Sequence, residues 1–511
     1  MMKISSLVSW LMKKRMHQIE LFMKYPHDVQ AEWLMKLVNS AQNTEWGKSY
    51  DYKSIRNRET FKKRVPIQDY EDIKPFVKRL MDGEQNILWN TDIKWFSKSS
   101  GTTSDKSKFI PVSQEALEEC HYKGGKDMLS LYCSNNPDTK IFDGKSLAMG
   151  GTHNVISLEN ESYYGDVSAI IMQNLPYWAE FIRTPNLEIA LMDEWEEKIK
   201  KMADATVNEN VTSMAGVPSW TLVLLRYILE KNGKKNVHDI WPNLEVFFHG
   251  AVSFTPYREQ YKSIISPKMN YMETYTASEG FFGIQDRKRA EDMLLMLDYG
   301  IYYEFLPMDE NDKEDAETLS LAEVKTGVNY ALIISTNAGL WRYKIGDTVQ
   351  FTSIDPYRIK VSGRTKHFIN AFGEELIIDN ADKALKIACQ KSNAVIKEYT
   401  AAPVYFSGNE TGSHEWLIEF EKQPHNLDYF TETLDNALKS LNSDYEAKRH
   451  KNIALRMPIV RALPTETFYK WLKSKNKLGG QYKVPRLSNE RKYVEEIISL
   501  IDGTVIHSTK S

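Results

Sequence analysis

Hydroxyl, glycine and lysine side chains are concentrated in residues 99–108, which read Ser-Ser-Gly-Thr-Thr-Ser-Asp-Lys-Ser-Lys. Hydroxyls, backbone amides and ammonium groups are the donors that proteins use to surround phosphate oxygens. The segment is not a Walker loop, because that loop needs a glycine directly before its lysine, and here Asp105 precedes Lys106. Taken alone, it is typical either of a loop that grips a polyphosphate or of a solvated turn rich in serine and threonine.

Three more polar segments follow in the chain and favour the first interpretation. They are residues 275–279 (Tyr-Thr-Ala-Ser-Glu), 343–347 (Tyr-Lys-Ile-Gly-Asp) and 363–369 (Gly-Arg-Thr-Lys-His-Phe-Ile). In this order, the four segments resemble the core motifs of the adenylate-forming ligase superfamily, which includes acyl-CoA synthetases, luciferases and the adenylation domains of peptide synthetases. One such motif would be a weak signal, whereas four collinear ones are strong.

Within that superfamily the sequence most resembles the Gretchen Hagen family of auxin-responsive acyl acid amido synthetases. The similarity extends from about residue 41 to residue 486 and includes residues 216–220 (Gly-Val-Pro-Ser-Trp), 247–257, 340–343 (Leu-Trp-Arg-Tyr) and 481–486 (Gln-Tyr-Lys-Val-Pro-Arg). The resemblance implies an enzyme that activates a small carboxylic acid with ATP and Mg²⁺ as an acyl-adenylate. It further implies that the acyl group passes to an amine, such as that of an amino acid.

The resemblance also implies a role for individual side chains around the nucleotide. The β- and γ-phosphates would be held by Ser99, Ser100, Thr102, Thr103 and Lys108, and the α-phosphate by Ser278. Glu279 would bind Mg²⁺, a hard cation that prefers carboxylate and phosphate oxygens. Adenine would lie beside a backbone wall and under a stacked ring, and the ribose would meet a carboxylate and a guanidinium; these groups are Gly250, Ala251, Tyr275, Asp347 and Arg364.

Two lysines, one within the last motif and one beyond it, complete the implied machinery. Lys483 would neutralise charge that develops at the α-phosphate during adenylation. Lys366 would lie in a hinge, at about residues 364–367, between the catalytic domain and a mobile lid. The acyl pocket should be apolar, and its candidates by position are Val217, Trp220, Leu222 and Phe254.

Two positions depart from the usual motifs. Ser104-Asp105 stands where the superfamily usually has a glycine and its neighbour, so an acidic group lies near the expected pyrophosphate. Thr276 replaces a common glycine and would narrow the space over the adenylate. Neither change removes a group that the chemistry requires.

The elements that must position these residues indicate an α/β protein. Helical spacing covers residues 28–43, and short apolar runs typical of strands occur at residues 147–149, 246–248, 302–306 and 331–335. After residue 363 the pattern is helix at 381–391, strands at 404–406 and 416–420, then helix at 429–441. We therefore expect a large N-terminal adenylation domain at residues 1–364 and a smaller C-terminal α+β lid domain at 365–511, with the active site in the cleft between them.

Bulk properties exclude several other classes. With 66 Lys and Arg against 69 Asp and Glu, a net charge of -3 gives no global reason to bind nucleic acid or an anionic membrane. The three cysteines are far apart and odd in number, which favours a reducing cytoplasmic setting over a disulfide framework. Leu7, Leu11, Ile19, Phe22 and Met23 recur at near-helical spacing, which predicts an amphipathic helix on the domain rather than a signal peptide or a membrane span.

The acceptor stays open at this point. An acyl-CoA ligase would perform the same first step and use a thiol in the second. A nucleotide-binding homologue without turnover is a third possibility, although a scaffold has no need to keep Glu279, Asp347 and Lys483 together.

Overall fold

The computed structural model describes residues 15–100, 107–150, 155–175, 180–192, 194–251, 254, 257–308, 310, 316–364, 368–406, 411–452, 454–475, 484–501 and 506–507. The chain divides into two compact units. The first consists of Met1–Ser99, Phe109–Ala251 and Glu259–Thr365, and the second of Ser100–Lys108, Val252–Arg258 and Lys366–Ser511.

The first unit is built on a mixed sheet of eleven strands in the order β12-β13-β14-β15-β11-β10-β9-β8-β7-β3-β6. From β6 to β9 neighbouring strands are parallel, and from β9 to β12 they are antiparallel. The strands are β3 (Lys145–Ala148), β6 (Arg183–Thr184), β7 (Val211–Gly216), β8 (Val246–Gly250), β9 (Asn270–Ala277), β10 (Gly280–Ile284), β11 (Met293–Leu295), β12 (Ile301–Pro307), β13 (Asn329–Thr336), β14 (Tyr343–Ile354) and β15 (Tyr357–Arg364).

Helices cover both faces of the parallel part, which explains why β7 and β8 are buried along most of their length without alternation. Successive side chains of a strand point to opposite faces. On β8, Phe247 stacks on Tyr261 of α12 (Arg258–Ile264) with ring centroids 5.3 Å apart, whereas Phe248 meets Tyr132 of α7 (Lys123–Asn135) edge-on at 5.7 Å. The mixed α/β class predicted from the sequence is thereby confirmed.

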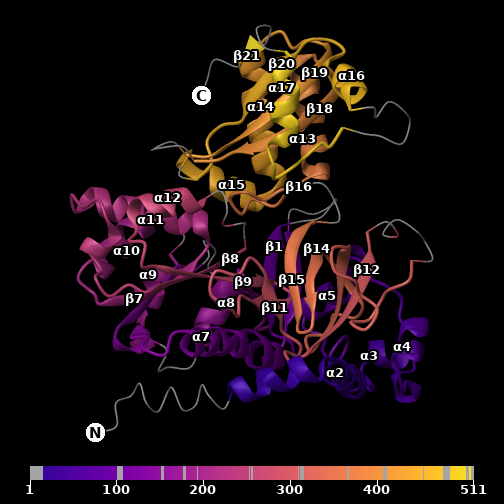
Figure 1. Cartoon of the computed structure of the whole chain (residues 1–511). Coiled ribbons are helices and arrows are strands. Elements are labelled where there is room, and N and C mark those ends of the chain that lie inside the picture. Colours follow the sequence, from indigo (N-terminus) through magenta and orange to yellow (C-terminus); the bar gives the residue numbers. More distant parts are fainter. Residues whose placement is uncertain are drawn as a thin grey trace. The chain divides into compact units, whose positions relative to one another are not determined.

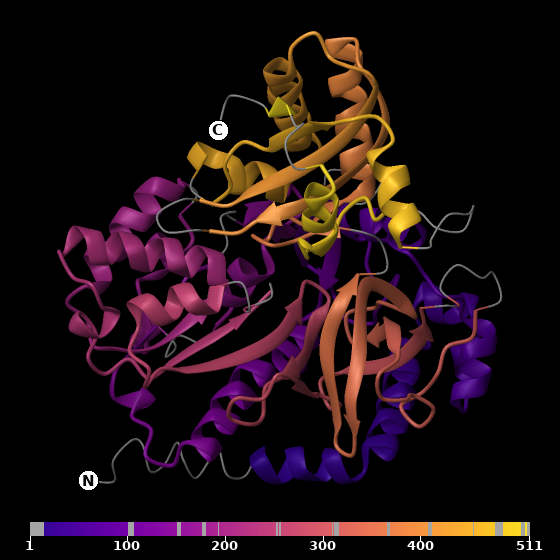
Figure 2. The same ribbon diagram turned by 45° about the horizontal axis from the view of Figure 1, so that its top comes forward.

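The antiparallel strands carry the main aromatic core. Phe305, Tyr330 and Phe351 come from β12, β13 and β14, and their rings pack edge to face with centroids 5.0–6.2 Å apart. Figure 2 shows the long β14–β15 hairpin running steeply across the direction of the parallel strands. The sheet is therefore strongly twisted and curled between its two parts.

Helices at the start of the chain pack on this core. Residues 15–24 are helical, and Ile19 and Phe22 are 1% and 2% exposed, as the near-helical spacing predicted. The helix expected at 28–43 is α2 (Pro26–Ala41), which runs with α7 along the base of the unit in Figure 1. Shorter helices are α3 (Glu45–Ser49), α4 (Arg58–Arg64), α5 (Tyr70–Met81), α6 (Gln114–Ala116), α8 (Val167–Gln173), α9 (Leu187–Ala190), α10 (Trp195–Thr206) and α11 (Pro218–Lys231).

A second, small sheet carries the ends of the predicted phosphate loop. Its order is β2-β1-β5-β4, with strands β1 (Trp95–Ser100), β2 (Ser107–Val112), β4 (Ile156–Ser157) and β5 (Tyr163–Gly165). Trp95 stacks on Tyr163 across the β1–β5 pair with centroids 4.8 Å apart, which fixes the register of β1.

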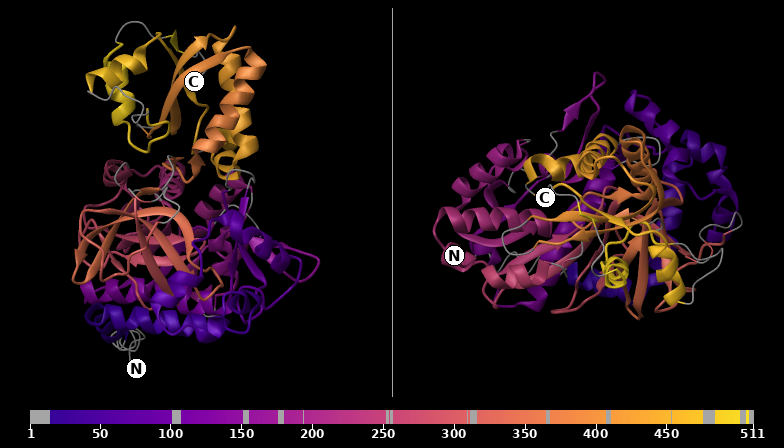
Figure 3. Two further views of the ribbon diagram at one scale, coloured as in Figure 1. Left: turned by 90° about the vertical axis from the view of Figure 1, so that its right-hand side faces the viewer. Right: turned by 90° about the horizontal axis from the view of Figure 1, so that it is seen from above.

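The second unit is an α+β domain, as predicted for the C-terminal part. Its sheet has the order β18-β19-β20-β21, and a two-stranded pair β16-β17 precedes it. In Figure 3 the helices α13 and α14 lie on one face of this sheet and α16 and α17 on the other. The elements are β16 (Phe368–Ile369), β17 (Leu376–Ile377), α13 (Ile378–Ser392), β18 (Val395–Val404), β19 (Ser413–Lys422), α14 (Leu427–Leu441), α15 (Ser443–Arg449), β20 (Ile459–Leu463), α16 (Thr467–Ser474), α17 (Lys492–Ser499) and β21 (Ile506–His507).

One predicted strand of this unit is wrong. The apolar run at 404–406 suggested a strand there, but β18 spans Val395–Val404 and ends where that run begins. β18 is an edge strand, which explains how Pro403 is accommodated. Tyr405 and Phe406 instead pack against Tyr257 and Phe372, with ring centroids 5.5–6.3 Å apart. In the part of the chain that is described, no helix is long and apolar enough to cross a membrane.

Candidate active site

The carboxyl ends of the parallel strands bring several predicted residues to one edge of the sheet. Gly216 ends β7 and is paired with His249, and Gly250 ends β8 and is paired with Thr274 of β9. Val217 follows β7 directly and leads into α11. Ligands of open α/β sheets bind outside the carboxyl ends of the strands. The register therefore places the predicted nucleotide wall and the start of the predicted acyl pocket on the same edge.

Gly250 has no side chain at this edge for a steric reason, and Ala251 turns the chain directly after it. A Cβ atom at Gly250 would lie 2.3 Å from the carbonyl oxygen of Thr274, a separation that real Cβ atoms do not tolerate. Ala251 has a φ of 67°, in the left-handed region, so the chain turns sharply after the strand. Exposed backbone of this kind suits close approach of a flat ring.

Ser278 and Glu279 occupy the tip of a tight hairpin. Ala277 of β9 pairs with Gly280 of β10, so these two residues form the whole turn, and both are partly exposed. Among the described residues no group of three or more His, Cys, Asp or Glu could hold a metal ion. A carboxylate at a hairpin tip is suited to Mg²⁺, because proteins often hold this ion with one or two carboxylates together with the phosphates of the substrate.

Tyr275 and Asp347 are joined by a hydrogen bond, and they come from two of the predicted motifs. The Tyr275 hydroxyl donates to Asp347 Oδ2 over 2.7 Å. β9 and β14 are four steps apart in the sheet, which is about 19 Å in a flat sheet. The contact is possible only because the sheet curls. It brings together two residues that are 72 positions apart in the chain.

Tyr275 itself is more buried than its predicted stacking role suggests. Its residue is 6% exposed, and its ring packs on Phe282 with centroids 4.9 Å apart and an interplanar angle of 51°. The sequence prediction treated Tyr275 as an aromatic platform and overlooked its hydroxyl. The structure shows that the hydroxyl orients Asp347, whereas adenine stacking stays a prediction.

Arg364 is placed opposite Asp347 by the strand register. The Cα atoms of the two residues are partners in the β14–β15 pair. The register therefore puts the backbone of Arg364 opposite that of Asp347. Assistance by its guanidinium stays a prediction.

The predicted phosphate loop is seen only at its ends. Ser99 and Ser100 are the last residues of β1, and Lys108 is the second residue of β2; Ser99 and Lys108 are partly exposed. Thr102 and Thr103 lie outside the described residues, as do Lys366 and Lys483.

Two of the acyl-pocket candidates on α11 face in different directions. Trp220 and Leu222 are two positions apart on α11, so their side chains point about 200° apart around the helix axis. They are 5% and 1% exposed, whereas Val217 at the start of the helix is partly exposed. Phe254 is 5% exposed and lies under the Arg258 guanidinium, 5.6 Å from its ring centroid.

Family models match most of the chain. The GH3 family N-terminal domain matches residues 15–269, the GH3 family central domain residues 294–364, and the GH3 family C-terminal domain residues 379–492. The Gretchen Hagen resemblance inferred from the motifs is thus confirmed.

Curated relatives cover nearly the whole length. Indole-3-acetic acid-amido synthetase GH3.3 of Arabidopsis thaliana is 24% identical, over 94% of this chain and 91% of the relative. 4-substituted benzoates-glutamate ligase GH3.12 of the same plant is 25% identical, over 84% and 87%. Jasmonoyl--L-amino acid synthetase JAR4 of Nicotiana attenuata is 22% identical, over 96% of both chains.

Solved structures agree on the fold. GH3.15 acyl acid amido synthetase has a TM-score of 0.62 at 17% identity, over 97% of each chain. A 2-hydroxyisobutyryl-CoA ligase, in complex with its acyl-AMP and CoA, has a TM-score of 0.53 at 13% identity, over 93% of this chain and 92% of the ligase. Because the N-terminal, central and C-terminal family models match most of the chain in that order, the chain belongs to the GH3 family.

Proposed function

We propose that this chain is an ATP-dependent acyl acid amido synthetase, which joins a small carboxylic acid to the amine of an amino acid through an acyl-adenylate. The observation that carries the proposal is the contact between Tyr275 and Asp347, because it unites two nucleotide motifs beside the carboxyl ends of the parallel strands. Named relatives that conjugate acids to amino acids support it.

In the first half-reaction a carboxylate oxygen of the acid attacks the α-phosphorus of ATP. The new bond joins that oxygen to phosphorus, the bond from the α-phosphorus to the bridging oxygen breaks, and pyrophosphate leaves with the electron pair. Asp347 accepts hydrogen bonds from the ribose hydroxyls. The Tyr275 hydroxyl, which also donates to Asp347, keeps the carboxylate in place. Glu279 would hold Mg²⁺, which would supply neutralisation of the charge on the leaving pyrophosphate.

The remaining polar residues act on the phosphates. Ser278, at the hairpin tip, donates to the α-phosphate, and the hydroxyl loop with Lys108 holds the phosphates that leave; its hydroxyl residues are Ser99, Ser100, Thr102 and Thr103. Lys483 neutralises charge at the α-phosphate during the attack.

In the second half-reaction an amine attacks the carbonyl carbon of the mixed anhydride. A carbon–nitrogen bond forms, the carbon–oxygen bond to AMP breaks, AMP leaves with that electron pair, and the amine nitrogen loses a proton to the solvent. The C-terminal domain, residues 365–511, is the lid, and residues near Lys366 are its hinge. Rotation about this hinge withdraws Lys483 from the α-phosphate and lets the acceptor amine approach the adenylate.

The acid is a small aryl or alkyl carboxylic acid. Val217 and Trp220 at the start of α11 are the better-placed contacts for its apolar part, since they adjoin the edge that carries Gly250. Indole, benzoate and jasmonate names among the relatives support apolar, ring-bearing acids. The balanced charge and free cysteines favour a cytoplasmic setting without nucleic-acid or membrane partners.

An acyl-CoA ligase is the second candidate. The likeness in fold to the 2-hydroxyisobutyryl-CoA ligase favours it over a nucleotide-binding homologue without turnover.

Acid-dependent exchange of labelled pyrophosphate into ATP tests the proposal, because exchange requires a reversible adenylation step. A panel of aryl and alkyl acids should contain at least one that stimulates exchange by the wild-type protein, and Glu279→Gln should suppress that exchange. Absence of exchange with every acid, or equal exchange by wild type and Glu279→Gln, would refute adenylation at this site.

A further inference from the structure

Arg342 is a buried arginine that stands directly before the strand carrying Asp347. The residue is 4% exposed and has a φ of 44°, in the left-handed region that residues other than glycine rarely adopt. Such a conformation persists only where the surroundings hold it. The contacts of Arg342 show what holds it.

All five N–H donors of its guanidinium are used. Nε and Nη2 donate to the two carboxylate oxygens of Glu304 over 2.9 and 3.0 Å, and Nη2 also donates to Thr318 Oγ1 over 2.9 Å. Nη1 donates to the carbonyl oxygens of Lys62 and Val65 over 3.0 and 2.7 Å. The Arg342 and Glu304 side chains are 5% and 1% exposed, so this is a buried, fully satisfied fork of the kind that only arginine can make.

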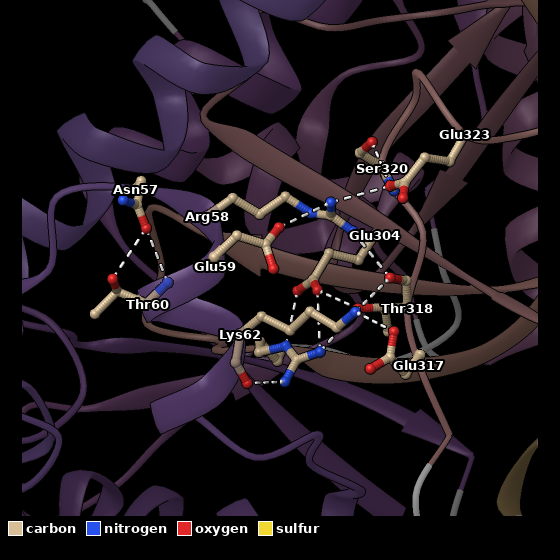
Figure 4. A network of polar contacts seen from close by, with 11 residues as sticks. Asn57, Arg58, Glu59, Thr60, Lys62, Glu304, Glu317, Thr318, Ser320 and Glu323 are labelled. Carbon is tan, nitrogen blue, oxygen red and sulfur yellow. Dashed lines mark hydrogen bonds and ion pairs between the residues drawn. The ribbon is translucent and has the colours of Figure 1, made fainter.

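A second set of contacts ties these partners to α4, as Figure 4 shows around Glu304 and Thr318. Arg58 Nη2 and Lys62 Nζ both donate to the Thr318 carbonyl oxygen, over 2.9 and 3.1 Å. Arg58 pairs with Glu323 at 3.0 Å, and Lys62 with Glu317 at 3.2 Å. Arg342 thus joins β12, α4 and the segment after residue 316 into one anchored group.

The backbone of Arg342 is held as firmly as its side chain. Its N–H donates to Ser335 Oγ over 2.9 Å, and its carbonyl oxygen accepts from the Gln68 N–H over 3.0 Å. The Lys344 N–H donates to the Gln68 carbonyl oxygen over 2.9 Å. These bonds fix the direction in which β14 starts.

The ladder between β13 and β14 does not set the position of Asp347 by itself. Ala331 pairs with Thr348, but Ile333 pairs with Lys344, so the register shifts and residues 345–347 form a bulge. Gly346 within it has a φ of 95°. Bulges near active sites aim a side chain in a chosen direction. Here the direction of Asp347 depends on restraints at the ends of the bulge as well as on its pairing with Arg364 of β15.

We propose that Arg342 is a positioning residue for nucleotide recognition: it fixes the start of β14 so that Asp347, in the bulge five residues further on, meets Tyr275 and the ribose. This inference rests on the proposed function in one respect, the binding of ribose hydroxyls by Asp347. A structural role alone would stabilise the fold and leave the discrimination between ribose and deoxyribose unchanged.

The test compares ATP with 2′-deoxyATP in pyrophosphate exchange, using an acid that the wild-type protein adenylates. 2′-DeoxyATP lacks the 2′-hydroxyl and therefore cannot form its hydrogen bond to the charged Asp347 carboxylate. The wild-type kcat/KM should for this reason be about tenfold or more higher with ATP than with 2′-deoxyATP. Arg342→Lys keeps the charge but loses the fork, and the double variant Arg342→Met with Glu304→Leu removes both buried charges together. In either variant the preference for ATP over 2′-deoxyATP should fall at least about threefold. A small displacement of Asp347 weakens its hydrogen bond with the 2′-hydroxyl of ATP.

Arg449→Lys is the matched control. Arg449 is also buried, at 7% exposure, and forms a fork with Asp435 at 2.6 and 2.8 Å, but it belongs to the C-terminal unit and to no nucleotide motif. It should lower the melting temperature as Arg342→Lys does and keep the wild-type preference for ATP.

The outcomes separate this inference from the proposed function. A wild-type preference for ATP in the folded Arg342 variants, or an equal loss of preference in Arg449→Lys, would overturn the positioning role. A wild-type protein that exchanges pyrophosphate but does not discriminate between the nucleotides would instead overturn the ribose assignment, and this inference with it.

Discussion

At the scale of single residues, the site depends on a tyrosine hydroxyl that holds a carboxylate. Sequence motifs identified both Tyr275 and Asp347 but assigned them to different parts of the nucleotide. Their contact at 2.7 Å depends on the curl of an eleven-stranded sheet, which no local pattern in the sequence encodes. The motifs therefore predicted a set of candidate residues, and the fold shows which two of them are joined by a hydrogen bond.

The first prediction concerns this pair. Asp347→Ala should weaken ATP binding by about 1.5–3 kcal/mol, the range for hydrogen bonds to a charged group. Tyr275→Phe should weaken it less, because the carboxylate remains and loses only one orienting donor. Isothermal titration of folded variants measures both, with Tyr330→Phe in the aromatic core as a control; wild-type affinity in Asp347→Ala would contradict the assignment.

The second prediction concerns Lys483. Its ammonium is useful while negative charge accumulates at the α-phosphate and is less useful when an amine attacks the adenylate carbonyl. Lys483→Ala should therefore slow adenylate formation by about 10²–10³-fold, the usual effect of removing one transition-state donor. Aminolysis of a supplied acyl-adenylate should be largely unchanged.

Single-turnover measurement of each half-reaction checks this, with Lys473→Ala on α16 as a control. Equal losses in the two steps, or no loss in either, would show that Lys483 does not act in adenylation.

At the scale of elements, the spacing of apolar residues predicted helices and buried strands well where burial alone decides which residues are apolar. Phe247 and Phe248 are both buried because helices cover both faces of β8, and continuous apolar runs reveal such strands. The signal failed at residues 404–406, where aromatic side chains serve a tertiary cluster rather than a strand. Register shifts, such as the bulge that carries Asp347, leave no periodic signal at all.

The third prediction uses a buried histidine in an irregular helical element. His121 lies in the π-helical turn Leu117–Tyr122, is 6% exposed, and has its pKa lowered by burial from 6.5 to about 4. Because the folded pKa lies below the unfolded one, the neutral histidine favours the folded state above pH 6.5, and this contribution is lost as the pH falls towards 4. The loss is on the order of 3 kcal/mol.

Denaturant unfolding between pH 7 and pH 4 should show a shallower decline for His121→Asn than for wild type. The control is His17→Asn, since the His17 side chain is 74% exposed and its loss should leave the wild-type slope. Parallel curves for wild type and His121→Asn would contradict the prediction.

At the scale of the whole molecule, the last segment of the first compact unit ends at Thr365 and the second unit continues from Lys366. Two short segments earlier in the chain, Ser100–Lys108 and Val252–Arg258, also belong to the second unit. The strands that carry the nucleotide motifs are followed in the sequence by the α+β pattern of the C-terminal part. This change is visible because periodicity and composition change together. The choice of acceptor has no such signature, since amide-forming and thioester-forming relatives share this fold.

The most direct test of amide formation is the identity of the product. The wild-type protein is incubated with ATP, Mg²⁺, an acid that supports pyrophosphate exchange, and either the proteinogenic amino acids or CoA, and the products are identified by mass spectrometry. We predict release of AMP with an acyl–amino acid amide in the first mixture and no thioester in the second. Formation of acyl-CoA without any amide would contradict the assignment.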